Sequence, residues 1–122
     1  MILDIEQAFK DYLFCALWSS VDFDNEDTPL DEDYSIDDID AETEKQLKEE
    51  FEDLCEYASS LIEQLPSWYD SGQLGHDFWL TRNGHGVGFW DRGLGKLGEE
   101  LTEASKTYGS LDLYVSDGKI YS

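Results

Sequence analysis

Apolar residues near the start of the chain recur every three or four positions, which is the period of an α-helix with one buried face. This pattern predicts a helix over residues 4–18, and the same spacing returns more strongly after Asp40. There it predicts a second, longer helix that Asp40 caps and Pro66 ends. The apolar positions of this second helix are Leu47, Phe51, Leu54, Cys55, Ala58, Leu61, Ile62 and Leu65.

The periodicity disappears between the two helices, over residues 19–41. Asn25, Pro29 and many aspartates take over, and these residue types favour turns over continued helix. Apolar residues such as Leu30 and Ile39 still recur there and are expected to hold the segment against the body of the protein. The sequence therefore predicts an acidic loop over residues 19–41.

The second half of the chain changes from a helical period to an alternating one. Residues 77–82 and 87–91 flank Asn83-Gly84, a dipeptide suited to a two-residue hairpin turn. In the resulting register Phe78 faces Phe89 on one side of the hairpin. The sequence thus predicts a β-hairpin over residues 77–91.

A third helix is predicted over residues 96–108, ended by Gly109, and a second hairpin is predicted around Asp117-Gly118. The expected fold class is α+β. Two N-terminal helices are followed by a hairpin, a helix and a hairpin, which form a roughly four-stranded antiparallel sheet with the helices on one face. We expect residues 1–122 to form a single acidic α+β domain.

Composition is compatible with a globular protein of the cytoplasm. The 122 residues are 40% hydrophobic, which is enough for a core, and they contain no apolar run long enough to span a membrane. The first residues lack the pattern of a secretory signal. Cys15 and Cys55 are neither close enough for a zinc site nor numerous enough for a disulfide scaffold, and we expect both to be reduced core residues.

Charge changes the functional expectation most. The formal net charge is −21, from 29 acids and 8 bases, and 17 of the acids lie between Asp22 and Glu56, opposed only by Lys45 and Lys48. Such a surface repels nucleic acid and anionic membrane and attracts a basic protein face. The residues that we expect to contact a basic partner protein are Asp31, Asp33, Asp37, Asp38, Asp40, Glu49, Glu52, Asp53 and Glu56.

The segment from residue 75 to 93 offers an alternative site. Its polar candidates are His76, Asp77, Arg82, His85, Asp91 and Arg92, which suit acid–base or anion-binding roles if they converge. In the predicted hairpin the two histidines lie near opposite ends, so no metal site is expected. The glycines lead into a strand and not into a helix, which argues against a nucleotide loop, and no cofactor is expected. No enzyme signature is present.

The motif His76-Asp77-Phe78-Trp79-Leu80-Thr81-Arg82-Asn83-Gly84-His85-Gly86 and its continuation to Gly93 resemble a family of small acidic proteins from bacteriophages and mobile elements, whose function is uncharacterised. The resemblance implies a phage context and a location in the cytoplasm of the host cell, and it implies no catalytic residues. Small acidic phage proteins often resemble DNA mimics that occupy the basic surfaces of host defence or DNA-processing proteins. That likeness is one of charge and not of descent.

Three hypotheses follow from the sequence. The first is a DNA-mimicking inhibitor whose acidic loop and second helix cover a basic host protein. The second is a small ligand-binding protein or enzyme centred on the histidine-containing hairpin. The third is a phage accessory protein that uses an aromatic hairpin as its contact surface, which an exposed patch of Trp79 and Trp90 would favour. The oligomeric state does not follow from the sequence.

Overall fold

Two long helices, α1 (Ile5–Ser19) and α3 (Ala41–Tyr57), dominate the N-terminal half, as the periodicity predicts. The structure is a computed structural model that describes residues 2–23 and 25–122. Each helix begins where a carboxylate accepts a free backbone amide. Asp4 accepts the N–H of Gln7 at 3.1 Å, and Asp40 accepts that of Thr43 at 3.2 Å. The predicted cap at Asp40 is therefore confirmed.

The predicted second helix is shorter than expected, because it is interrupted at Ala58. Ala58 has φ −97° and ψ 17°, which turns the chain out of helical geometry after Tyr57. The short helix α4 (Ser59–Glu63) follows. Ile62 and Leu65 remain buried beyond the break, so the apolar pattern that predicted one helix is satisfied by two.

The acidic segment over residues 19–41 contains short regular elements. Strands β1 (Val21–Asp22) and β2 (Thr28–Pro29) pair antiparallel, and α2 (Leu30–Asp33) and the 3-10 helix η1 (Ile36–Asp38) follow. Leu30 and Ile39 are buried and fasten the segment to the core, as expected. Asp24, one of the 17 acids of this region, lies outside the described residues.

The predicted four-stranded sheet is wrong. Residues 77–82 belong to helix α5 (Ser71–Arg82), and residues 87–91 lie in a loop that ends in the 3-10 helix η2 (Phe89–Asp91). The described part of the chain is 58% helical, and its strands form two small two-stranded antiparallel sheets. An α+β mixture is present, but helices dominate it.

Asn83-Gly84 ends α5 and does not turn a hairpin. Gly84 has φ +68°, its N–H donates to the Thr81 carbonyl at 3.2 Å, and the His85 N–H donates to the Leu80 carbonyl at 3.0 Å. These two bonds form the Schellman motif that closes many helices. A left-handed glycine serves a helix end as well as a hairpin turn, so the dipeptide alone did not distinguish the two.

The C-terminal elements agree with the sequence. Helix α6 (Lys96–Lys106) is followed by strands β3 (Tyr114–Ser116) and β4 (Lys119–Tyr121), which pair antiparallel around the predicted turn. Tyr114 and Tyr121 stack on one face with their ring centroids 5.7 Å apart. The hairpin docks on the start of α3, where the Asp40 N–H donates to the Ile120 carbonyl at 2.9 Å.

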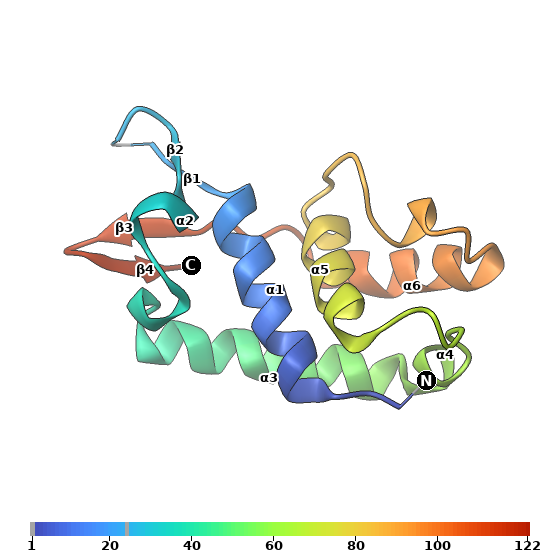
Figure 1. The fold of residues 1–122 in the computed structure, drawn as a ribbon. Coiled ribbons are helices and arrows are strands. Elements are labelled where there is room, and N and C mark those ends of the chain that lie inside the picture. The colour runs from blue at the N-terminus through green and yellow to red at the C-terminus, as the bar shows by residue number, and fades with distance from the viewer. Residues whose placement is uncertain (1, 24) are drawn as a thin grey trace.

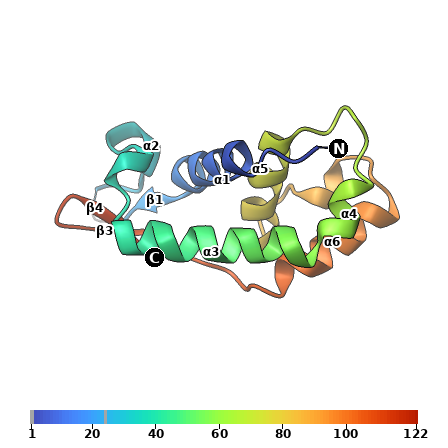
Figure 2. The same ribbon diagram turned by 90° about the horizontal axis from the view of Figure 1, so that it is seen from below.

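Helices α1 and α5 cross tightly above α3, while α6 lies beside α5 (Figures 1 and 2). The core between them is aromatic: the ring of Tyr12 lies 5.2 Å from that of Phe51 on α3 and 5.2 Å from that of Phe78 on α5. At the crossing a Cβ on Gly75 would lie 1.8 Å from the Ala8 carbonyl oxygen, so only glycine fits there. No helix in the described part of the chain is both long and apolar enough to cross a membrane.

Candidate functional site

Asp77, the most polar residue of the motif, is fully buried. Its carboxylate accepts hydrogen bonds from the Tyr69 hydroxyl at 2.6 Å and the Gln73 amide at 3.0 Å, and Arg92 donates to it through two nitrogens at 2.8–3.2 Å. Burial, with the Asp77 charge beside it, raises the pKa of Tyr69, so this hydroxyl is a donor at all ordinary pH values. Asp77 is thus a compensated core charge that fastens the loop after α5.

Arg82 is buried at the other end of α5 and joins distant parts of the chain. Its guanidinium donates to the Tyr12 hydroxyl at 3.1 Å and forms an ion pair with Glu50 on α3. It also donates to the Tyr108 carbonyl at 3.0 Å and the Gly109 carbonyl at 2.9 Å. These contacts tie α1, α3 and the end of α6 to α5, which is a structural role.

The two histidines lie in different places. His76 lines a cavity of about 490 Å³ together with Asp11, Asp70 and Arg92, whereas His85 lines another, of about 300 Å³, beside Trp79. The six residues of the predicted alternative site are therefore divided between two cavities, the core and the surface, where Asp91 is exposed.

One polar atom of this region stands out. Nδ1 of His76 is buried, lies 4.0 Å from Oδ1 of Asp77, and has no hydrogen-bond partner among the described residues. The His76 ring lies 5.7 Å from that of Trp18. Within residues 2–23 and 25–122, no group of three or more His, Cys, Asp or Glu side chains is placed to hold a metal ion.

The predicted acidic residues lie on the outside of α2, η1 and α3, and we call this surface the acidic face. Figure 2 shows α3 running across the molecule with α2 above its N-terminal end in that view. Four members accept hydrogen bonds from the chain itself. Asp38 closes the capping box of η1, and Asp40 caps α3. Asp33 accepts the Asn25 amide at 3.2 Å, and Asp53 accepts the Tyr108 hydroxyl at 2.9 Å. The exposed members are Asp31, Asp33, Asp37, Glu49, Glu52, Asp53 and Glu56.

Both arginines of the chain are used internally. Arg82 pairs with Glu50 and Arg92 with Asp77, and their side chains are 1% and 27% exposed. Since each arginine is matched by one carboxylate, the net charge of −21 rests on the remaining acids and the lysines. Outside these two pairs the chain has 27 acids against 6 lysines.

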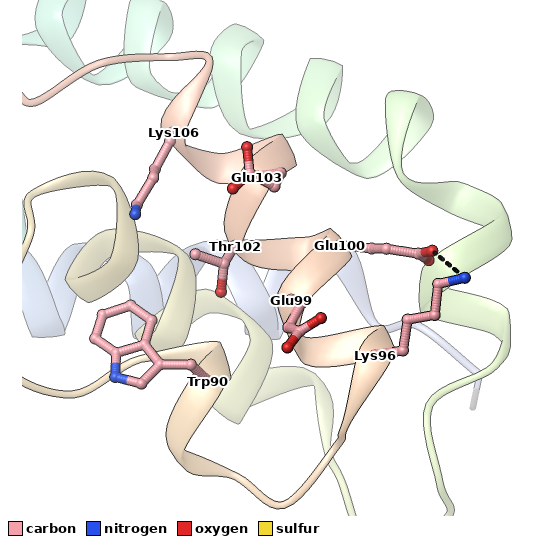
Figure 3. A pocket seen from close by; sticks show the side chains of 7 residues that line it. All are labelled: Trp90, Lys96, Glu99, Glu100, Thr102, Glu103 and Lys106. Atoms are coloured by element: carbon pink, nitrogen blue, oxygen red, sulfur yellow. Dashed lines mark ion pairs between the residues drawn. The ribbon is translucent and has the colours of Figure 1, made fainter.

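A third cavity, which the sequence did not predict, lies on the outer face of α6 (Figure 3). It has a volume of about 560 Å³, and Trp90 forms one wall opposite the helix. Three carboxylates of α6, those of Glu99, Glu100 and Glu103, line it. The spacing of these acids on a predicted helix was visible in the sequence, but the position of Trp90 depends on the loop after α5, which was predicted as a strand.

Comparison with known proteins gives no match for this chain: no protein-family model, no curated protein and no solved structure matches it. The resemblance to phage proteins stays a prediction. The surfaces and cavities described above are therefore the basis for the proposed function.

Proposed function

We propose that this chain is an inhibitory binding protein that covers the basic, nucleic-acid-binding surface of another protein and competes there with DNA or RNA. The acidic face is the observation that supports this proposal. It presents exposed carboxylates from α2, η1 and α3, whereas both arginines point into internal ion pairs. A surface of this kind accelerates encounters with basic proteins and excludes nucleic acid as a direct partner.

The spacing of carboxylates on α3 suits mimicry of a phosphate backbone. Glu49, Glu52, Asp53 and Glu56 follow one side of the helix at successive turns, a rise of ~5 Å per turn, similar in scale to the separation of phosphates along a DNA strand. Leu47, Phe51 and Leu54 bury the opposite side of the same helix. The carboxylates are thus presented on a rigid support, which reduces the entropy lost on binding.

The proposed setting is the cytoplasm of a bacterial host, with a defence or DNA-processing protein as the target. The ligand-binding alternative has less support, because its six candidate residues do not share one cavity and two of them, Asp77 and Arg82, have all their charge compensated internally. The cavity beside His76 is the place where that alternative would have to operate.

The test is capture of partners from host lysate, followed by displacement of fluorescent duplex DNA from each captured protein. We expect the wild-type chain to displace the DNA and its affinity to fall as salt is added. A variant with Glu49→Gln, Glu52→Gln, Asp53→Asn and Glu56→Gln should lose most of this activity. Binding that persists in high salt, or that the variant retains in full, would contradict the proposal.

A matched control removes the same number of charges elsewhere on the surface. Glu6→Gln, Glu63→Gln, Asp112→Asn and Asp117→Asn alter exposed residues outside the acidic face. If net charge alone drives binding, the two variants will weaken equally. If the acidic face is the contact surface, only the α3 variant will lose DNA displacement.

A further inference from the structure

Trp90 is a large apolar side chain that the fold holds at the surface. It is 41% exposed, although its neighbour Phe89 is completely buried and the next arginine, Arg92, is tied to the buried Asp77. Exposure of an indole is unfavourable in water unless something covers it. The loop therefore turns two of these side chains inward and leaves Trp90 outward, against α6 (Figure 3).

The orientation of Trp90 is fixed by the motif itself. A Cβ at Gly88 would lie 2.6 Å from Cζ3 of the indole and 2.5 Å from Oγ1 of Thr81, so the absence of a side chain there lets the ring fold back over the backbone. The Phe89 N–H donates to that same Thr81 hydroxyl at 3.2 Å. Trp90 is held in place by its own loop before any ligand arrives, which lowers the entropy cost of binding.

The chemistry of the cavity favours a cation. Three carboxylates, those of Glu99, Glu100 and Glu103, outnumber the two lysines that line it, Lys96 and Lys106, and Lys96 lies 4.0 Å from Glu100. Figure 3 shows Lys106 extending toward Trp90, but among the described residues the cation–π contacts are those on Phe14 and Phe78, so an entering cation would compete with Lys106 for the indole. An indole face beside carboxylates is the combination that receives a guanidinium, which stacks on the ring while its N–H groups pair with the acids.

The cavity shares two of its lining residues with a second one beside the end of α3. Glu100 and Glu103 also line a neighbouring cavity of about 500 Å³, whose aromatic residue is Tyr57 at the end of α3. Tyr57 is 69% exposed and follows directly after Glu56. The same two carboxylates thus line one cavity with Trp90 and another with Tyr57, which follows the acidic residues of α3.

We propose that the cavity between Trp90 and α6 receives an arginine side chain projecting from the basic partner protein. The inference rests on the proposed function and sharpens it, because it gives a diffuse charge attraction a specific anchor. The acidic face would bring the two proteins together, and the stacked arginine would set their register. A lysine would fill the cavity less well, because its ammonium lacks the planar surface that stacks on an indole.

The experiment titrates the protein with an oligoarginine peptide and an oligolysine peptide of equal length. The indole N–H signals of the four tryptophans are followed by NMR, and Trp90→Phe assigns the signal of Trp90. We expect the Trp90 signal to move with oligoarginine and to move less with oligolysine. Trp90→Ala should weaken oligoarginine binding about fivefold, while Trp68→Ala, which removes another exposed indole, should leave it unchanged.

The result that overturns the inference is an unchanged affinity for oligoarginine in Trp90→Ala, or equal responses to the two peptides. If the α3 variant described above still loses binding in that case, the proposed function stands and the arginine anchor fails. If instead the α3 variant binds and displaces DNA normally, the proposed function fails. Should Trp90→Ala not fold, the double variant Glu99→Gln, Glu103→Gln at two exposed residues tests the same cavity. It should weaken the binding of oligoarginine more than the binding of oligolysine.

Discussion

Helices α3 and α5 use their polar residues in opposite ways. Helix α3 buries one stripe and leaves Glu49, Glu52 and Glu56 in water, whereas α5 buries nine of its twelve residues, including Asp77 and Arg82. Asp77 and Arg82 of α5 are consumed by contacts within the protein, while Glu49, Glu52 and Glu56 of α3 remain available to a partner. The most distinctive motif of the sequence therefore builds the scaffold, and the less distinctive acidic helix is the better candidate for binding.

The structural role of α5 is tested most directly by Gly75→Ala, which would push α5 away from α1. Alanine favours an isolated helix over glycine by about 1 kcal/mol, but here its Cβ would meet the Ala8 carbonyl oxygen at 1.8 Å and the Tyr12 nitrogen at 2.9 Å. We expect the free energy of unfolding to fall by more than about 3 kcal/mol, measured by urea denaturation.

Gly86→Ala is the matched control, because nothing lies within 4 Å of a Cβ at that position. It should leave stability unchanged or raise it by about 0.5 kcal/mol. Equal stability of the two variants would show that the α1–α5 crossing is not as close as described.

The same crossing explains which parts of the fold the sequence predicted. Helices α1 and α3 have a solvent face, so their apolar residues repeat with the helical period and were recognised. Helix α5 has almost no solvent face, so its apolar run has no helical period, and Asn83-Gly84 was ambiguous. Short-range alternation then favoured a strand, whereas packing against α1 through Gly75 favours the helix. Only tertiary contact distinguishes the two.

The next largest effect is expected from Asp77→Asn, which removes the buried negative charge that holds Arg92. Loss of a buried ion-pair partner is strongly destabilising, and because Arg92 is 27% exposed and can recover some hydration, we expect a loss of about 2–3 kcal/mol. Asp91→Asn, an exposed acid of the same motif, should change stability by less than about 0.5 kcal/mol. Similar denaturation curves for the two variants would argue against a structural role for Asp77.

The candidate site was predictable to different degrees. The acidic face could be predicted from the sequence, because the density of acidic residues along the chain does not depend on which fold is predicted. The alternative site was predicted on a hairpin, but His76, Asp77 and Arg82 lie on a helix. Because successive residues of a helix point 100° apart, these three side chains have different surroundings. The Trp90 cavity was missed because its walls come from η2 and α6, and the segment that contains η2 was predicted as a strand.

A third prediction concerns pH and the buried thiols of α1 and α3. Burial raises the pKa of Cys15 and of Cys55 from 9.0 to about 12. The folded state keeps these protons while the unfolded chain releases them near pH 9, so unfolding releases protons in this window. Their contribution to stability is complete below pH 9 and is lost as the pH rises toward about 12.

We expect the free energy of unfolding to fall by about 2.7 kcal/mol between pH 8 and pH 10 from the two thiols together. The double variant Cys15→Ala, Cys55→Ala should show a flatter pH dependence over this range, whatever its stability at pH 8. An unchanged slope would mean that the thiols titrate normally. In the folded wild-type protein, neither thiol should react with iodoacetamide at pH 8.

The smallest expected change in stability is the most informative about function. On α3, Glu49 and Asp53, and likewise Glu52 and Glu56, are like charges four residues apart, and no basic residue occupies the last turn of the helix. Neutralising all four should therefore raise the free energy of unfolding, by about 0.5 kcal/mol, because the amide oxygen in Asp53→Asn can still accept the Tyr108 hydroxyl. The control variant, whose neutralised charges lie off this helix, should gain less.

Added salt tests the same repulsion without mutation. It should stabilise the wild-type protein more than the α3 variant, because screening relieves a repulsion that the variant lacks. Residues at binding surfaces often oppose stability. An α3 variant that is more stable than the wild-type protein but no longer displaces DNA would therefore show that these carboxylates serve binding and not folding. If neutralisation instead destabilises α3, the acids contribute to folding, and the contrast with α5 disappears.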